Sequence, residues 1–551
     1  MGLYSDLDPL AEVPEGTETR INRGQFVYRA VAAGLAPAAV GLVPSLAEAA
    51  SSGSAASGGT LRIRAEFDLT SADNAFESTF IDEQIALSVY EGLVCYKPGT
   101  WQVVNCLADV FEQSADGLRF HFKLKKGIPF HQSYGEVTAS DVKYSYERIA
   151  GLTKPKLNSP YAGDWATLSH VQVKSKYEGT IILKERFAPL MRTTLPINSG
   201  LVLSQKAIEK LGKKYGVNPI GTGPYEFTKW TPKQQMVLTK FAEYGKANSA
   251  YAKPAQWDKI IVLPIAADSA AETALQAGDI DFTSIPTSAV DRLRANSKFN
   301  TVTRPTLNYT WLSMNVKDPV LSDINVRKAI RQAIDIPSII QAAADGKFAR
   351  LNAIIPKAMG IGYWPGAPQY NRDVNKAKAY LNAASPAAKA GAANMKLTVI
   401  DAEQDKTVAQ VIQANLADIG IKITIEAQDG ATFNAIPGAG GGGKNRQLVY
   451  TLFTTQPDPS WSTVWFTCAQ VPQWNFGEWC SPRYEKPNNA ALKTSDPARR
   501  TALYIDLQRA WDREANMVWI WNPTLTYSSK KSLRPSLRPD GTVLYWDFRS
   551  A

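Results

Sequence analysis

Short β-prone runs alternate with stretches of helical periodicity along most of this chain. Apolar residues recur at helical spacing in residues 407–419, Gly420 follows as a predicted C-cap, and residues 421–425 are β-prone. Further β-prone runs occupy residues 60–63, 120–124, 259–264 and 397–400, and further helical stretches occupy residues 326–334 and 339–344. This alternation predicts a mixed α/β fold. A chain of 551 residues exceeds what one hydrophobic core supports, so we expect several domains.

The first 49 residues are predicted to be a signal peptide. Residues 30–46 are apolar and rich in small side chains, three arginines precede them, and Ala47-Glu48-Ala49 has the form cleaved by signal peptidase. A retained membrane helix is the weaker alternative, because the run is shorter than about 20 residues. Arg23-Gly24 resembles a twin-arginine pattern with its second arginine replaced, which leaves the export route open. We expect a periplasmic protein, with residues 50–57 as a flexible linker.

The chain is basic, but its charge is dispersed. The formal charge is +10, and removal of residues 1–49 leaves 58 basic against 45 acidic residues, a balance of +13. The basic residues form no stripe interleaved with aromatic side chains, which argues against nucleic acid as a partner.

The four cysteines are expected to form two local disulfides. Cys95 and Cys106 flank a turn at residues 97–100 between two β-prone runs, and Cys468 and Cys480 are similarly close in sequence. Metal ligation is the weaker alternative, because the spacings differ from C-x-x-C and only three histidines are available. We therefore predict no metal and no cofactor.

A series of local motifs in fixed order resembles one protein family. The strongest lies at residues 117–131 and 137–145; the others lie at residues 90–93, 219–225, 277–281, 326–330, 333–335 and 371–381, ending with Asn475 beside Cys480. Together they resemble the extracytoplasmic solute-binding proteins of the peptide and nickel ABC-transporter family, from about Gly59 to the C-terminus. Two motifs also have local interpretations: Thr138 and Asp141 form a predicted capping box, and Gly221 and Gly223 a turn with positive φ.

The resemblance implies a two-lobed periplasmic binding protein (type II) with an extra inserted domain. Lobe I would comprise residues 58–95, 216–310 and 523–551, the insertion residues 96–215, and lobe II residues 311–522. The crossings near residues 310 and 522 would act as hinges. The implied function is non-enzymatic: the protein captures a small solute and delivers it to the transmembrane permease subunits of an ABC importer, as a monomer.

Tryptophans concentrate near the C-terminus, where eight of the 14 follow residue 460. Trp511 lies in a helical stretch and is predicted to be core. Trp461, Trp474 and Trp521 fall in loops or at a crossing, and Trp311 lies beside the other crossing. A flat aromatic ring there can form a pocket wall or stack on a sugar, so these four are candidate ligand contacts.

The anchor for a peptide amine departs from the family pattern. In peptide-binding members, an aspartate three residues before an acidic-Pro pair binds the ligand's α-ammonium group; here that pair is Asp458-Pro459 and the matching residue is Thr455. A hydroxyl cannot neutralise an ammonium, so the departure favours a neutral, hydroxyl-rich solute such as an oligosaccharide, with a peptide as the other candidate ligand. Asp458, which could substitute or form a turn, and Asn475 complete the candidate ligand residues.

Two other function classes have weaker support. Residues 438–444 satisfy the start of a phosphate-binding loop, but Asn445 replaces the Mg-binding Ser or Thr, and the strand-like residues 448–453 follow where a helix is needed. An exported hydrolase such as a glycosidase is the main alternative. The chain has no G-x-S-x-G or H-E-x-x-H motif, although paired carboxylates are always available among 51 acids.

Overall fold

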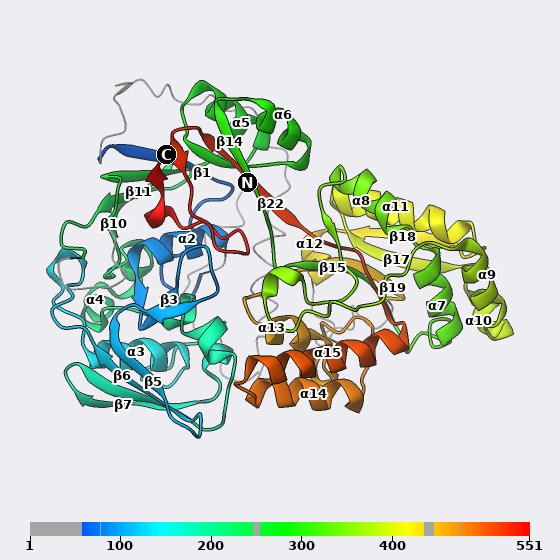
Figure 1. Cartoon of the computed structure of the whole chain (residues 1–551), viewed down its shortest axis with the longest axis horizontal. Coiled ribbons are helices and arrows are strands. Elements are labelled where there is room, and N and C mark those ends of the chain that lie inside the picture. Colours follow the sequence, from blue (N-terminus) through cyan, green and yellow to red (C-terminus); the bar gives the residue numbers. More distant parts are fainter. Residues whose placement is uncertain (1–57, 78, 246–253, 435–445, 472) are drawn as a thin grey trace.

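The chain forms two lobes joined by extended segments (Figure 1). The computed structural model describes residues 58–77, 79–245, 254–434, 446–471 and 473–551. Both lobes contain a mixed β-sheet covered by helices, so the predicted mixed α/β fold is confirmed. The signal peptide, the linker and the loop at residues 438–444 lie outside the described residues.

The first lobe is built on a seven-stranded sheet. Its central strand β1 (Thr60–Ala65) pairs in parallel with its two neighbours, and the outer pairs are antiparallel. The order is β10 (Tyr225–Thr231), β11 (Gln235–Lys240), β12 (Lys259–Pro264), β1, β13 (Phe282–Ile285), β22 (Thr524–Lys530) and β14 (Phe299–Pro305). The helices of this lobe are α2 (Phe80–Val89), α5 (Asp268–Ala277) and α6 (Val290–Ala295). Strand β22 arrives from the far end of the chain, so the C-terminal segment completes this sheet.

A smaller antiparallel unit is inserted after α2. Its four-stranded sheet has the order β5 (Ala108–Gln113), β6 (Arg119–Leu124), β8 (Glu178–Leu183), β7 (Leu168–Ser175), and it carries α3 (Ala139–Ile149) and α4 (Gln205–Leu211). Two short pairs link it to the lobe: β2 (Glu91–Gly92) with β9 (Leu201–Val202), and β3 (Val94–Tyr96) with β4 (Val103–Asn105).

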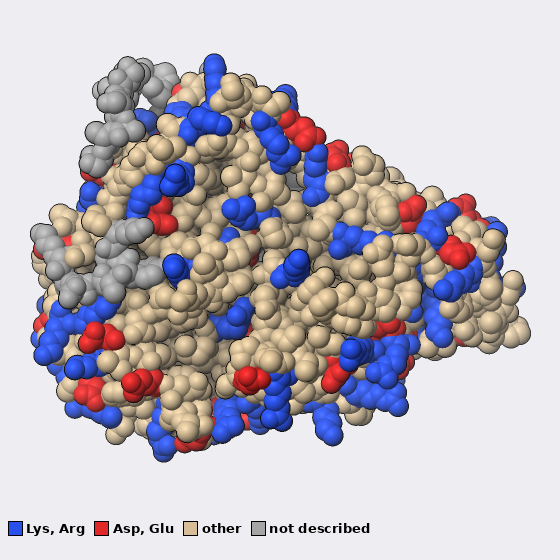
Figure 2. Space-filling model, in the orientation of Figure 1, with Lys and Arg blue, Asp and Glu red and all other residues tan. Residues whose placement is uncertain are grey.

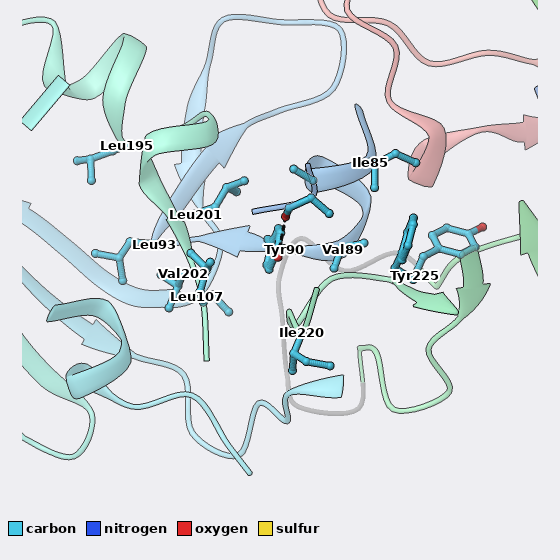
Figure 3. Packing of buried hydrophobic residues seen from close by; sticks show 14 of the residues in the cluster. Ile85, Val89, Tyr90, Leu93, Leu107, Leu195, Leu201, Val202, Ile220 and Tyr225 are labelled. Atoms are coloured by element: carbon cyan, nitrogen blue, oxygen red, sulfur yellow. Dashed lines mark hydrogen bonds between the residues drawn. The ribbon is translucent and has the colours of Figure 1, made fainter. Parts of the chain in front are cut away.

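The inserted unit and the first lobe share one continuous core. Figure 3 shows Val89 and Tyr90 at the end of α2 among Leu107 and Leu201 of the insertion, and all four side chains belong to the same buried cluster. The Tyr90 hydroxyl donates to the carbonyl oxygen of Ala72 (2.9 Å), which satisfies the one polar atom of this ring. The insertion is thus fixed rigidly to the first lobe.

The second lobe has a five-stranded sheet that is covered on both faces. The order is β18 (Ile423–Gln428), β17 (Met395–Ile400), β19 (Leu448–Phe453), β15 (Tyr309–Met314), β20 (Met517–Trp519). All six residues of β15 are buried: Leu312 and Met314 join one core cluster, and Tyr309 and Trp311 the other. Because side chains alternate along a strand, β15 serves both clusters, and its two polar residues, Thr310 and Ser313, are small hydroxyl side chains that are also buried.

Helices divide between those two faces. The aliphatic cluster contains residues of α7 (Ile324–Ala333), α8 (Ile336–Ala344), α9 (Val374–Asn382), α10 (Pro386–Gly391) and α11 (Glu403–Ala417). The aromatic cluster contains residues of α12 (Gly430–Asn434), α13 (Pro459–Thr463), α14 (Pro482–Lys493) and α15 (Pro497–Glu514). Two short pairs complete the strands: β16 (Ala349–Arg350) with β21 (Trp521–Asn522), and β23 (Leu533–Arg534) with β24 (Arg549–Ser550).

Two predictions that depend on residues close together in the sequence are confirmed. The capping box at the start of α3 is confirmed, because Thr138 and Asp141 bond each other's backbone groups reciprocally. The helix predicted at residues 407–419 is α11, and Gly420 beyond its end has φ 87°. Leucine, isoleucine and valine spacing therefore predicted the element and its end to within a few residues.

The prediction of positive φ at Gly221 and Gly223 was wrong. Neither glycine is left-handed; instead a Cβ atom on Gly221 would lie 2.0 Å from the carbonyl oxygen of Val89, and one on Gly223 would lie 2.7 Å from that of Ser88. Both positions need glycine because this segment passes against the end of α2, where no side chain fits.

Among the described helices, none is both long and apolar enough to cross a bilayer.

Candidate functional site

The two interlobe segments lie side by side. Residues 306–308 lead from β14 to β15, and Pro523 leads from β21 back to β22. The Thr306 amide and hydroxyl both donate to the Pro523 carbonyl oxygen (3.0 and 2.8 Å), and the Asn522 amide donates to the carbonyl oxygens of Thr306 (2.9 Å) and Asn308 (2.7 Å). These bonds join the segments into one connection about which the lobes can rotate.

The lobes also touch through the inserted unit. Arg192 donates from Nε to the carbonyl oxygen of Pro457 (2.7 Å) and from Nη2 to that of Met359 (3.0 Å). Trp101 donates from its indole nitrogen to the carbonyl oxygen of Ala358 (2.8 Å). The acceptors belong to the second lobe, so the inserted unit is in direct contact with that lobe.

The inserted unit also contacts the second lobe at the end of α14. The Ala188 amide donates to the carbonyl oxygen of Leu492 (2.7 Å), and Lys493 forms an ion pair with Glu185 (2.8 Å). Glu185 and Lys493 are both exposed, so this ion pair adds little to closure.

Asp458, a predicted ligand residue, has its charge neutralised within the protein. Its side chain is fully buried and accepts two bonds from Arg500 (2.6 and 2.8 Å) and one from the Ser460 amide (3.0 Å), which caps α13. Arg192 lies 3.9 Å from the same carboxylate. Burial acts to raise the pKa of Asp458, but Arg500 and then Arg192 outweigh it, so the pKa lies below its ordinary value. Asp458 is therefore committed to Arg500 and serves the turn that the sequence offered as its other role.

Thr455 stands at the connection between the lobes. Its amide donates to the Asn308 side chain (3.3 Å), and its hydroxyl shares a hydrogen bond with Ser462 (2.9 Å). Its side chain is half-buried, so it lies near the crossing without being part of the core. Trp461, in α13, is 4% exposed and its ring lies 6.4 Å from that of Trp465.

The other candidate tryptophans are packed inside the second lobe. Trp311 is fully buried with its ring 4.6 Å from Phe453, and Trp521 is fully buried with its ring 5.5 Å from Phe348. Trp474 is 2% exposed and also packs on Phe453 (6.0 Å). In this conformation these three rings are buried in the second lobe, and their contact with a ligand stays a prediction. Burying a large aromatic ring is favourable, and Trp474 shows that a residue in a loop can be buried as completely as one in a strand.

Asn475 has a local structural role. Its amide donates to the carbonyl oxygens of Trp479 (2.8 Å) and Thr467 (3.3 Å), so it closes the loop that Cys468 and Cys480 bracket. These two cysteines form the predicted disulfide.

The predicted bond between Cys95 and Cys106 is absent, and both residues are free thiols. In the β3–β4 hairpin Cys95 stands opposite Val104, and Cys106 follows the last paired residue. The two thiols are nevertheless neighbours, because a hydrogen bond to Cys95 is the largest cause that raises the pKa of Cys106. Cys106 donates to Glu91 (3.4 Å). Within the described residues, no three His, Cys, Asp or Glu side chains are arranged to hold a metal.

A cavity of about 330 Å³ lies beside the connection between the lobes. Pro305 at the end of β14 and Asn522 of β21 contribute to its wall. The rest of the wall comes from residues 349–367, including Arg350, Asn352, Lys357, Tyr363 and Trp364. Sequence reasoning missed this segment. The adjacent aromatic residues Tyr363 and Trp364 in an irregular stretch rich in Gly and Pro were the only available signal.

Comparison with known proteins identifies the family. The model of the bacterial extracellular solute-binding proteins, family 5, matches residues 102–469. The chain belongs to this family. The resemblance deduced from the ordered motifs is thereby confirmed, and this family-5 protein is a solute-binding protein of the kind that serves ABC transporters.

Individual relatives are similar to nearly the whole chain. The glutathione-binding protein GsiB of Pectobacterium atrosepticum is 27% identical over 495 residues, covering 87% of this chain and 91% of GsiB. The solved structure of HbpA2 from Haemophilus parasuis has a TM-score of 0.80 at 22% identity, covering 90% of this chain and all of HbpA2. The periplasmic binding protein DppA from Helicobacter pylori, in complex with the peptide STSA, has a TM-score of 0.72 at 23% identity and covers 90% and 98%. The predicted two-lobed binding-protein fold is confirmed.

The surface of this family-5 protein carries mixed charges. Figure 2 shows Lys and Arg side chains spread over both lobes of the visible face, with Asp and Glu among them. The dispersed pattern agrees with the interpretation of the positive charge as general surface charge.

Proposed function

We propose that this protein is the substrate-binding component of an ABC importer. It captures a small solute between its lobes in the periplasm, as a monomer and without chemical conversion, and delivers it to the transmembrane permease subunits. The division proposed for this task is lobe I at residues 58–95, 216–310 and 523–551, the insertion at 96–215, and lobe II at 311–522.

One observation carries the proposal: the lobes are joined by a single hydrogen-bonded pair of crossings and otherwise meet through separate hydrogen bonds and ion pairs. Separating the lobes would break the contacts that Trp101, Glu185, Ala188, Arg192, Thr287 and Asp291 make with the second lobe, without breaking a sheet. A ligand that binds the closed form more tightly than the open form shifts this equilibrium by its difference in affinity.

The ligand proposed is peptide-like. The tryptophans that favoured a sugar are buried in the second lobe in this conformation, which gives an oligosaccharide less support than a peptide-like solute. Thr455 still replaces the acidic residue that anchors a free amine, so recognition must depend on other parts of the solute. An exported hydrolase such as a glycosidase is the alternative.

The test is to identify what the protein carries. The protein is purified from the periplasm without refolding and denatured, and the released compounds are identified by mass spectrometry. Calorimetry with the identified compound should show one site per chain, and small-angle scattering should show a smaller radius of gyration with it than after its removal. Recovery of the compound in altered form after incubation would favour the hydrolase, and absence of any bound or stabilising solute would contradict the proposal.

A further inference from the structure

The cavity beside the crossings has an unusual charge pattern. Among its lining residues are the cations Arg350 and Lys357, and none is Asp or Glu. Its volume of about 330 Å³ falls in the range of small-molecule sites, and its wall includes residues from both crossings. A solute seated here would therefore contact the part of the molecule about which the lobes rotate.

Arg350 is a half-buried guanidinium without an anionic partner. It donates from Nη1 to the Asn371 side chain (2.8 Å) and from Nη2 to the carbonyl oxygen of Tyr370, both neutral acceptors. Its buried Nε has no hydrogen-bond partner in the described part of the chain. Burial lowers the pKa of Arg350, and Asp335 opposes this effect without forming an ion pair. A desolvated cation of this kind is stabilised by an anion that reaches it.

Lys357 supplies a second positive charge at the place where the lobes meet. It is exposed and has no ion-pair partner within the described ranges. The next two residues, Ala358 and Met359, provide the carbonyl oxygens that accept hydrogen bonds from Trp101 and Arg192. An anion held by Lys357 is thus adjacent to the interlobe contacts.

Asn352 and two aromatic residues complete the chemistry. Asn352 lies in the cavity wall, and its buried Oδ1 atom has no partner among the described residues, which leaves an unsatisfied acceptor beside the cavity. Tyr363 and Trp364 contribute apolar surface to the same cavity. A carboxylate, a nearby N–H and an apolar side chain are the groups found together in the last residue of a peptide.

We propose that this cavity binds the carboxylate end of a peptide-like solute. Arg350 and Lys357 receive the carboxylate, Asn352 accepts from the final peptide N–H, and Tyr363 and Trp364 contact the final side chain. The inference rests on the proposed transport function and specifies its ligand: recognition through the acidic end takes the place of recognition through the amine, for which Thr455 provides no charge.

The test uses matched acid and amide probes. Affinities for the dipeptide Met-Leu, its C-terminal amide, glutathione and the neutral trisaccharide maltotriose are measured by calorimetry and thermal shift. We expect the acids to bind at least tenfold more tightly than the amide. The Arg350→Gln/Lys357→Gln variant should abolish this preference. The control Arg483→Gln/Lys486→Gln removes the same charge from exposed positions on α14 and should retain it.

Three outcomes would overturn the inference: equal affinity for acid and amide, a preference for acids that survives in the Arg350/Lys357 variant, or binding of maltotriose alone. Failure of all probes would also overturn carboxylates as the ligand class. The transport function is judged separately, by the compound that co-purifies with the protein.

Discussion

Asp458 offers the sharpest test of how the second lobe is held together. Its carboxylate is fully buried and accepts two hydrogen bonds from Arg500, whose side chain is only 3% exposed. The substitution Asp458→Asn keeps the size of the side chain and one acceptor for the Ser460 amide, but it leaves the Arg500 cation buried without a counter-charge. Removing one partner of a buried ion pair costs about 3–5 kcal/mol.

The expected effect is large enough to measure by thermal unfolding. If the second lobe unfolds as a unit of its size, this loss lowers Tm by roughly 6–20 °C. The matched control is Asp418→Asn, because Asp418 is 56% exposed and pairs with Arg372 on the surface of the same lobe. An exposed pair contributes about 0–1 kcal/mol, so this control should lower Tm by only a few degrees.

The pH dependence gives an independent check. The pKa of Asp458 in the folded protein lies below the unfolded value of about 3.9. The ionised carboxylate therefore contributes fully to the free energy of unfolding above about pH 3.9, and this contribution is lost as the pH falls through the folded pKa. The difference in free energy of unfolding between wild type and Asp458→Asn should therefore stay constant from pH 7 to about 5 and become smaller below pH 4. A decrease of less than about 1 kcal/mol in the free energy of unfolding of Asp458→Asn at pH 7 would refute the reasoning. A decrease no larger than that of the Asp418→Asn control would also refute it.

Three further outcomes are expected. Burial lowers the pKa of His131 to about 4. The free energy of unfolding of the wild type should therefore fall by about 3 kcal/mol between pH 6.5 and pH 4. Denaturant titrations of His131→Gln should show a free energy of unfolding that depends less on pH in that interval. Thiol titration of the unreduced, denatured protein should find two free thiols, and replacing both Cys468 and Cys480 by Ser should cost about 3 kcal/mol, since the bond closes a loop of 12 residues. Arg192→Gln removes both charge-assisted interlobe bonds, so small-angle scattering should show a larger radius of gyration than wild type; an unchanged radius would contradict a role in closure.

Short-range features of this protein could be predicted from its sequence. The capping box of Thr138 and Asp141 involves residues three apart, and α11 follows from the spacing of its own apolar side chains. Cys468 and Cys480 lie 12 residues apart, close enough for proximity in sequence to predict their bond. The order of the family motifs likewise needed no coordinates. In the capping box, the helix and the disulfide, the interacting residues are close together in the chain, so these features can be predicted from local sequence.

The candidate site depends on contacts between distant segments, and only the tertiary structure decided it. Asp458 appeared free in sequence because Arg500, its partner, is 42 residues away. Trp521 lies beside a crossing in sequence, yet its ring is packed inside the second lobe. The cavity joins Pro305, Arg350 and Asn522, whose proximity arises because β16 pairs with β21 where the two crossings meet. The sequence alone determined the elements, the family and the two-lobed plan. Which charges are neutralised and which face a cavity was decided by folding, because electrostatics and burial act through space and do not follow the order of the chain.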